Sequence, residues 1–600
     1  MQRTKSIGML LGRAAAIGAV ASAAWLAPGS VTPARACGGF FCQQQSPVDQ
    51  SAENIIFVHD EQAGTVTAVI QILYQGPSEK FAWLLPVPGK PTVGLSSNAA
   101  FQNLRGATDP QYNLTVEVEG ECMDGEQFAT GGMAGGFAVP GAMSEDANGG
   151  VNVIDQGSVG PYDYVTISLD PGLAEPADVA VMWLVDNGYD VTAIGPEVLG
   201  PYLEDGLNLI AFRLTKGNEV GAIRPVIITY DSSLPMIPIR PTQVAAVPDM
   251  GVRVWMVAAH QAIPKNYMSL VLNEALINWF CWSCNYEQVI SAAADQAGGQ
   301  GFTTELAAPS ADYDEAIFGA AAMADWQAYQ STQFADGFDA IQQASFRYRG
   351  YDGWKEAVCA KDVTTLPAGV TCDQFGMNPD SYRGQVSIDV TAFLKHLYEG
   401  VIKPVIDTQK LLVSQPYLTR LYTTMSPEEM TVDPLFDINP DLADYSNIHT
   451  AKQIIECNPD IYSYEAPWRI ELPQGGVIRG TGQGTWPIDV ATTDLPANHK
   501  IVMLTTEGEG EVLEDNTETI NESLFKMSGM TSPPVGTPPK GGVPIGGTAG
   551  MTGSMQTSDG DGGGGFCSAS APGVMGTRGM RAWPLVLLVV GLALRLRRRR

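Results

Sequence analysis

Apolar and polar residues alternate over much of the N-terminal part of the chain, which is the pattern of half-buried β-strands. Residues 54–59 and 65–74 show it on either side of a short loop that ends in Gly64, so they predict a β-hairpin. Apolar or alternating runs predict further strands at residues 81–85, 113–119, 164–169, 208–214, 226–230 and 252–258. The N-terminal part is therefore expected to be rich in strands.

Alanine-rich segments replace this alternation in the middle of the chain. Residues 287–297 and 314–343 have the composition of α-helices, and residues 390–398 are a further helix candidate. Residues 426–429 (Ser-Pro-Glu-Glu) predict a helix start, with Ser as the N-cap, Pro in the first helical position and Glu in the third. The middle of the chain is therefore expected to be mainly helical.

The C-terminal part combines a polar loop, strands and a low-complexity stretch. Residues 433–451 are predicted to form an acidic loop, and strands are expected again between residues 468 and 502. From residue 529 the composition is reduced to Gly, Pro, Ser, Thr and Met, which predicts a disordered stalk. Residues 123–150 are rich in glycine and predict a flexible insertion.

Composition thus divides the chain into about three folded bodies between two terminal segments, and the fold class expected is α+β. The expected parts are a signal peptide at 1–36, a strand-rich domain at 37–265, a helix-rich region at 266–430, an acidic loop with strands at 431–528, a stalk at 529–566 and a sorting or membrane segment at 567–600.

The N-terminus has the features of a secretory signal. Basic residues precede a small-residue apolar stretch that ends at residues 34–36 (Ala-Arg-Ala), an A-x-A cleavage site. We expect cleavage between Ala36 and Cys37 and export of the chain. A lipoprotein modified at Cys37 is the alternative. It is disfavoured because the usual Leu three residues before the cysteine is missing and the residue two positions before it, Arg35, carries a charge.

The C-terminus resembles a surface-sorting signal. Cys567 follows a glycine run, and an apolar stretch from Ala582 to Leu594 precedes a run of arginines. These features resemble the MYXO-CTERM signal of delta-proteobacterial surface proteins, which implies that Cys567 is processed and modified by a sorting peptidase. A plain membrane anchor is the alternative, although its 13 apolar residues form a helix of only about 20 Å, against a hydrocarbon layer of about 30 Å. Both interpretations attach the protein to a membrane at the cell surface.

The chain is strongly acidic, with 65 Asp and Glu against 35 Lys and Arg. The two terminal segments hold 11 of these basic residues and no acidic residue, so the part between them has a formal charge near −41. Such a surface repels nucleic acid and anionic lipid, and it suits a soluble extracellular domain.

The cysteine count agrees with export. If Cys567 is set aside for sorting, an even number remains, which allows four disulfides in an oxidising compartment. Spacing suggests three local pairs and leaves one long-range pair: Cys37 with Cys42, Cys281 with Cys284, Cys359 with Cys372, and Cys122 with Cys457.

Cys281-Trp-Ser-Cys284 has the C-x-x-C spacing of a thiol–disulfide exchange pair. Such a pair normally opens a helix in a compact βαβ unit. Here it follows the mostly apolar run of residues 268–280, and no such unit is evident around it, so a structural bridge is favoured over a redox site.

Other motifs give weaker indications. Residues 437–441 (Asp-Ile-Asn-Pro-Asp) resemble the beginning of a calcium loop, but the Gly and the final Glu that such a loop needs are missing, so an Asx turn is favoured over calcium. No other cofactor is expected. The five histidines are scattered, which gives no zinc-ligand spacing, and the sequence contains no catalytic motif of a hydrolase or nucleotide-binding protein.

Several local motifs occur in the order of a known family. They are residues 36–42 (Ala-Cys-Gly-Gly-Phe-Phe-Cys), 53–57, 81–88, 159–163 and 183–189. Together they resemble the uncharacterised bacterial family called domain of unknown function 2330, over roughly residues 37–304 and more loosely at 417–422 and 429–434. This resemblance implies export and a surface location, and the family has no established activity.

The sequence therefore favours a surface-anchored, disulfide-stabilised protein for adhesion, envelope interaction or ligand binding, without enzymatic activity. The alternative is an exported enzyme, either an oxidoreductase at Cys281 and Cys284 or a hydrolase whose acids the sequence does not single out.

Overall fold

The computed structural model describes residues 40–41, 49–75, 82–123, 151–170, 172–187, 196–214, 223–244, 246–482 and 485–528. Helices (31%) and strands (35%) both contribute, which confirms the α+β class. The predicted signal peptide, stalk and tail lie outside these residues, as do Cys37, Cys42, Cys567, Ala582 and Leu594.

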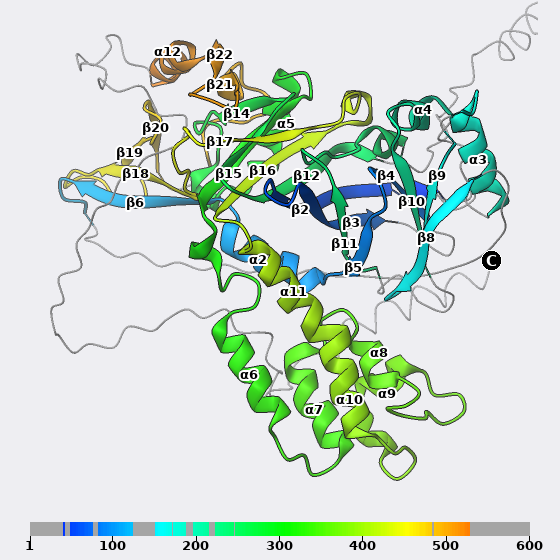
Figure 1. Cartoon of the computed structure of the whole chain (residues 1–600). Coiled ribbons are helices and arrows are strands. Elements are labelled where there is room, and N and C mark those ends of the chain that lie inside the picture. Colours follow the sequence, from blue (N-terminus) through cyan, green and yellow to red (C-terminus); the bar gives the residue numbers. More distant parts are fainter. Residues whose placement is uncertain are drawn as a thin grey trace, which may run out of the picture. The chain divides into compact units, whose positions relative to one another are not determined.

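Among the described residues, ten strands form the largest sheet, called the main sheet below (Figure 1). In spatial order they are β22 (Glu511–Asp515), β21 (Asn498–Met503), β14 (Met268–Leu272), β15 (Gly301–Pro309), β16 (Tyr417–Met425), β12 (Ala246–Ala258), β2 (Asp49–Asp60), β3 (Thr65–Gln75), β11 (Val226–Asp231) and β5 (Thr92–Leu95).

The predicted β-hairpin at the N-terminal end is confirmed as β2 and β3 of the main sheet. The Asp60 carboxylate accepts hydrogen bonds from the backbone N–H groups of Gln62 and Ala63. Gly64 closes the turn with φ +67°, a conformation that glycine adopts without steric cost. Local turn chemistry and strand alternation thus agree at this hairpin.

A second sheet packs on one face of the main sheet. Its strands follow the order β1 (Phe40–Phe41), β4 (Ala82–Val87), β10 (Asn208–Leu214), β9 (Tyr162–Ser168) and β8 (Asn152–Val159). Trp83 and Phe212 of this sheet stack with ring centroids 5.1 Å apart, in the same buried core as Phe57 and Val254 of the main sheet. Helices α3 (Pro176–Asp186) and α4 (Pro196–Glu204) contribute Trp183 and Leu199 to a separate core, which they share with the second sheet.

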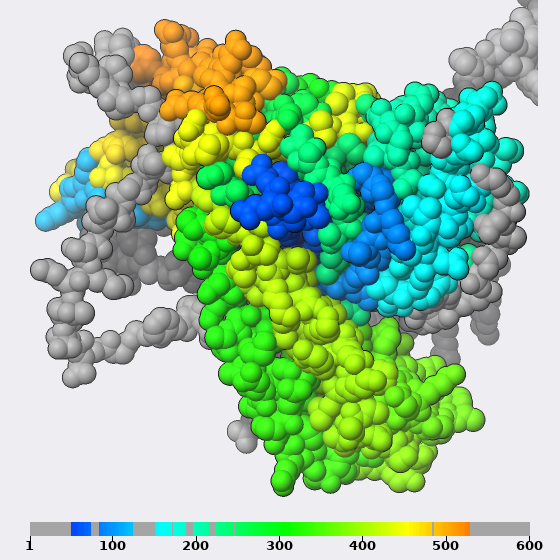
Figure 2. Space-filling model, in the orientation of Figure 1, coloured from blue at the N-terminus to red at the C-terminus, as the bar shows by residue number. Residues whose placement is uncertain are grey.

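A group of helices is inserted between β15 and β16, which are antiparallel neighbours in the main sheet. It comprises α6 (Ala320–Gln330), α7 (Gly337–Tyr348), α8 (Trp354–Cys359), α9 (Cys372–Met377), α10 (Val390–Leu397) and α11 (Lys403–Leu412). In Figure 2 these residues, green to yellow-green, form one continuous region at the bottom of the view. The expected helix-rich region, 266–430, thus begins and ends with strands of the main sheet.

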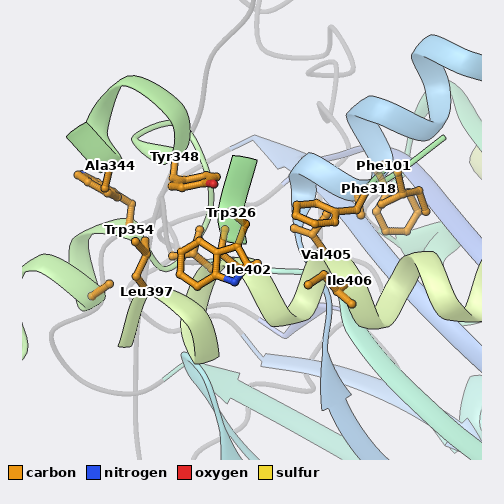
Figure 3. Packing of buried hydrophobic residues seen from close by; sticks show 14 of the residues in the cluster. Phe101, Phe318, Trp326, Ala344, Tyr348, Trp354, Leu397, Ile402, Val405 and Ile406 are labelled. Carbon is orange, nitrogen blue, oxygen red and sulfur yellow. The ribbon is translucent and has the colours of Figure 1, made fainter. Parts of the chain in front are cut away.

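Apolar side chains connect this helical group to the main sheet. Trp326, Trp354 and Val405 pack in one buried cluster (Figure 3). The same cluster contains Phe101 of α2 (Asn98–Thr108) and Trp255 of β12, whose rings meet edge to face with centroids 5.9 Å apart. The helices therefore share a core with the main sheet.

The structure corrects three local predictions. The helix predicted over residues 314–343 is interrupted before Asp336, whose carboxylate caps α7 by accepting a hydrogen bond from the Asp339 N–H. The helix predicted at 426–429 has its capping box but is a single 3₁₀ turn. Residues 433–451, predicted as a loop, contain β17 (Phe436–Asn439) and the start of β18 (Ile448–Glu456). In the third case pairing with distant strands, which local composition does not report, decided the outcome.

A third sheet ties the first and last folded parts together. Its strands follow the order β20 (Val477–Thr481), β19 (Pro467–Glu471), β18 and β6 (Gln111–Glu119), and β18 and β6 are parallel. A disulfide between Cys122 and Cys457 lies just beyond the ends of these two strands. Two further disulfides, Cys281–Cys284 and Cys359–Cys372, complete the bridges of the described residues, and all three join the cysteines that spacing had paired.

Candidate functional site: a cavity between two sheets

A cavity of about 310 Å³ lies where the second sheet packs on the main sheet. This volume is at the lower end of the range of small-molecule sites in proteins. Strands β2 and β3 of the main sheet, the end of β4 in the second sheet, and the chain after β11 form its walls. The described lining residues are Glu53, Ile55, Phe57, Ala68, Ile70, Leu85, Pro86, Val87, Pro88, Asp205, Leu207, Tyr230, Ser232, Ser233, Leu234, Met236, Pro238 and Leu435.

Strand periodicity places the apolar wall. Ile55 and Phe57 are two residues apart on β2, so their side chains point to the same face of the sheet. In the antiparallel pairing with β3, Ile55 lies opposite Ile70, and Phe57 lies opposite Ala68. All four side chains are buried. Because Glu53 has the same parity on β2, it points to this face as well.

Glu53 is the buried carboxyl group of the cavity, with an exposed fraction of 6%. Its strand neighbours are the apolar residues Ile72 of β3 and Val252 of β12. The side-chain amide of Gln50 donates a hydrogen bond to Glu53 Oε2 over 3.3 Å. Burial raises the pKa of Glu53 from 4.5 to about 7, and the hydrogen bond from Gln50 opposes this shift. Near neutral pH this carboxyl group therefore exists in both its neutral and its charged form.

The other polar groups of the cavity lie at its side and mouth. Tyr230 is buried, and burial raises the pKa of its phenol, so the hydroxyl stays protonated and able to donate. Asp205 and Ser233 are exposed. Among the described lining residues there is no Lys, Arg or His, so the charge of this lining is negative or neutral.

A second concentration of ionisable groups surrounds Arg420, which is 1% exposed. Its guanidinium lies 2.5 Å from Glu305 Oε2 and 2.6 Å from Asp109 Oδ1, and it donates to Thr108 Oγ1 over 3.0 Å. Glu305 occupies a β-bulge of β15, where the register against β16 shifts, and it accepts a hydrogen bond from the Tyr286 hydroxyl.

This cluster connects elements rather than forming a binding site. Thr108 ends α2 and Asp109 is its C-cap, so the Arg420 cation lies at the end of the helix where cations are favourable. The indole of Trp255 also donates to Thr108 Oγ1. Arg420 and Glu305 are both fully buried, so their charged groups are not exposed to a solute.

The C-x-x-C motif forms a closed disulfide just before α5 (Tyr286–Gln296). Trp282 and Ser283 between the cysteines have φ +51° and +66°. This left-handed backbone conformation costs about 1–2 kcal/mol for each residue other than glycine. For cysteines only three positions apart, the chain-entropy model gives about 2 kcal/mol of stabilisation. These two effects offset each other, so stability alone does not account for this bridge.

The expected calcium-like loop has protein partners for its polar groups. Asp437 pairs with Lys265 at 2.6 Å, and the Asn439 amide donates to the carbonyl oxygens of Thr505 and Gly508. Asn439 Oδ1 also accepts from the Asp441 N–H, which is the Asx turn that the sequence favoured. Within the described residues no group of three or more His, Cys, Asp or Glu is arranged to hold a metal ion. Calcium binding stays a prediction.

Sequence reasoning missed the cavity because its walls come from distant strands. One signal was present, since Glu53 is an acidic residue two positions before the apolar run of residues 55–58. The predicted membrane segment and the cleavage and sorting residues lie outside the described part of the chain. Within the described part, no helix has both the length and the apolarity that a membrane crossing needs.

Comparison with known proteins agrees with the motif resemblance. The model of a family described as uncharacterised proteins conserved in bacteria, DUF2330, matches residues 31–351, which is more than half of the chain. No curated protein and no solved structure matches significantly. The matched region contains the cavity walls except Leu435 and also the C-x-x-C loop. This chain therefore belongs to the bacterial family DUF2330.

Proposed function

We propose that this chain is an exported, surface-held binding protein whose cavity takes a small, mainly apolar ligand with one cationic or hydrogen-bond-donating group. The observation that carries this proposal is the cavity between the two sheets, with Glu53 as its buried carboxyl group. Its walls are largely aliphatic, which favours an apolar body of the ligand. A carboxyl group without a basic neighbour in the described lining favours an amine and repels a carboxylate.

Export and surface attachment are supported by the sequence. A signal peptide, a stalk and a sorting signal at Cys567 form a consistent set, and disulfide bonds suit an oxidising compartment. In this proposal the C-terminal segment holds the folded part at the envelope through the membrane, and the cavity serves ligand binding there. In a broader form of this proposal, the protein binds a group on another surface and so serves adhesion.

The described lining favours binding over hydrolysis. Acyl-transfer enzymes need a nucleophile activated by an adjacent base, and no His, Cys or Lys is found among these residues. Glycoside hydrolysis needs two carboxyl groups on either side of the bond that is cleaved. Here Glu53 is buried but Asp205 is exposed, so the two carboxyl groups do not share one environment.

Matched probes of one chain length test the ligand class. Titration calorimetry on the full-length chain with hexylamine, hexanol and hexanoate should give at least tenfold tighter binding of the amine than of the carboxylate. Leu234→Trp fills part of the cavity and should weaken amine binding at least tenfold. Leu513→Trp, at an exposed position of β22, is the matched control and should bind like the wild type. Tightest binding of hexanoate, or equal effects of the two Trp variants, would contradict the proposal.

A further inference from the structure

The C-x-x-C loop lies in a βαβ unit, which the sequence did not reveal. Strands β14 and β15 are parallel neighbours, with Met268 opposite Gly301 and Leu270 opposite Thr303. Helix α5 connects them and packs against both strands and β16 (Figure 1). The disulfide lies between β14 and α5, which is the position that thiol–disulfide exchange pairs occupy. The motif therefore lies at the strand-to-helix connection of a βαβ unit, which the sequence pattern around it did not indicate.

One cysteine of this bridge is an exposed residue. Of the six cysteines that the structure describes, Cys284 alone is exposed. Cys281 is partly buried and lies 3.5 Å from the Asn278 carbonyl oxygen. An attacking thiolate therefore reaches Cys284, and Cys281 is the sulfur that leaves.

The start of α5 favours a thiolate on Cys284. Asn285 is the N-cap, and its side chain makes no capping hydrogen bond. The N-terminal end of a helix stabilises a nearby negative charge, although Glu287 in the first turn of α5 opposes this effect. Cys284 directly precedes this N-cap, so the helix stabilises its thiolate once the bridge opens.

The loop between the cysteines also suits a polypeptide partner. Trp282 is 58% exposed, so it offers an apolar surface beside the accessible sulfur. Trp282 and Ser283 are two of the three residues other than glycine with positive φ in the described part of the chain. Opening the disulfide releases this restraint, which favours the reduced form.

We propose that Cys281 and Cys284 form a thiol–disulfide exchange site that oxidises dithiols of other exported polypeptides. A substrate thiolate attacks Cys284 Sγ, the Cys281–Cys284 bond breaks, and Cys281 leaves as a thiolate that takes up a proton. The second substrate thiolate then attacks the substrate sulfur of the mixed disulfide and releases the Cys284 thiolate. Two electrons pass from the substrate dithiol to this chain, Cys281 takes up one proton, and the other substrate proton goes to solvent while Cys284 is a thiolate. A small disulfide from the surroundings restores the bridge.

The order in which the bridges open tests accessibility without any variant. The oxidised full-length chain is incubated with increasing dithiothreitol, alkylated and mapped by mass spectrometry. Cys281–Cys284 should open at a concentration at least tenfold lower than Cys359–Cys372, which is the matched local bridge. Opening together with the control, or after it, would overturn the proposal.

Transfer of the bridge tests the activity itself. The oxidised chain is mixed with a reduced peptide that contains two cysteines, and the peptide disulfide is measured. The wild type should yield one peptide disulfide per chain, and Cys359→Ser/Cys372→Ser should give the same yield. Cys281→Ser/Cys284→Ser should give none above the rate of the peptide alone. An equal yield from this variant, or no yield from the wild type, would exclude exchange at this site.

Discussion

Glu53 and Arg420 are both buried side chains that carry a charge in water, but the protein accommodates them differently. Arg420 keeps its charge because two carboxylates and a hydroxyl surround it. Glu53 has only the Gln50 amide as its hydrogen-bond partner, and its pKa rises to about 7. Arg420 therefore serves structure, whereas Glu53 remains available to a ligand that enters the cavity.

Glu53→Gln should remove a pH dependence of stability. The pKa of Glu53 is about 7 in the folded state against 4.5 as a free group, so the folded state binds the proton more tightly. The associated stability is complete below about pH 4.5 and is lost as the pH rises through 7, by about 3 kcal/mol in total. At pH 8 the variant should therefore be more stable than the wild type. Urea unfolding between pH 4.5 and 8 measures this, with exposed Glu61→Gln as the control.

The outcome for Glu53 also bears on ligand binding. An ammonium ligand binds the charged form of Glu53, so its affinity in the wild type should rise as the pH increases from 5 to 8. In Glu53→Gln this increase should disappear. If the unfolding free energy of both proteins changes with pH in the same way, Glu53 does not titrate near neutral pH and is not the group that the ligand meets.

Arg420→Met should strongly destabilise the fold, because it removes the ion-pair partner of the fully buried Glu305. Removing one partner of a buried ion pair typically costs about 3–5 kcal/mol. Arg347→Met breaks an ion pair with Asp325 in which both side chains are more than a third exposed, so its cost should stay below about 1 kcal/mol. Unfolding midpoints of the two variants provide the comparison. Equal losses would show that the buried cluster is not a structural link.

At the scale of elements, the parallel pairing of β6 with β18 joins segments far apart in sequence. Nine residue pairs run from Gln111↔Ile448 to Glu119↔Glu456. The pairing of the two strands is continuous, without a register shift. The disulfide Cys122–Cys457 links the chain just beyond their ends, at a sequence separation of 335. By comparison, Cys359–Cys372 spans 13 residues within the helical group. Long loops gain most from closure in the chain-entropy picture.

Opening the long bridge should therefore cost more than opening the local one. Cys122→Ser/Cys457→Ser should lose about 2–5 kcal/mol of unfolding free energy. Cys359→Ser/Cys372→Ser is the matched control and should lose less. Denaturant unfolding of both double variants measures the difference. A larger loss in the control would mean that the pairing of β6 and β18 persists without its bridge.

At the scale of the whole molecule, the folded part is built by long-range pairing of segments. Strand β2 pairs in parallel with β12, and the helical group is inserted between β15 and β16. From the formal charge of −30 we expect the protein to repel nucleic acid. The proposed surface attachment rests on the C-terminal segment, apart from the proposed binding and exchange sites.

Cys567→Ala should stop C-terminal processing and leave the folded part unchanged. The sorting interpretation requires this cysteine, whereas a plain membrane anchor does not. Intact mass of the surface form from the wild type and the variant distinguishes the two. A mature wild-type chain that still ends in Arg600 would exclude cleavage and favour the anchor.

Sequence by itself determined the elements whose signals are local. The hairpin of β2 and β3, the strand β10 (Asn208–Leu214) and the helix α10 (Val390–Leu397) follow from alternation, turn residues and helix composition. Motifs in a fixed order also identified the family before the comparison. Alternation, turn residues and helix composition reflect the backbone geometry of one short segment, so they can be read without knowing its distant partners.

Tertiary structure alone decided the sites. Glu53 meets Leu85 and Tyr230 in one cavity only because two sheets pack face to face. The C-x-x-C loop belongs to a βαβ unit only because β14 pairs with β15 across the length of α5. Strand pairing depends on which distant segment supplies the partner, and the sequence of one strand does not encode that choice. For this reason the strands were predictable, whereas the cavity and the setting of Cys281 and Cys284 were not.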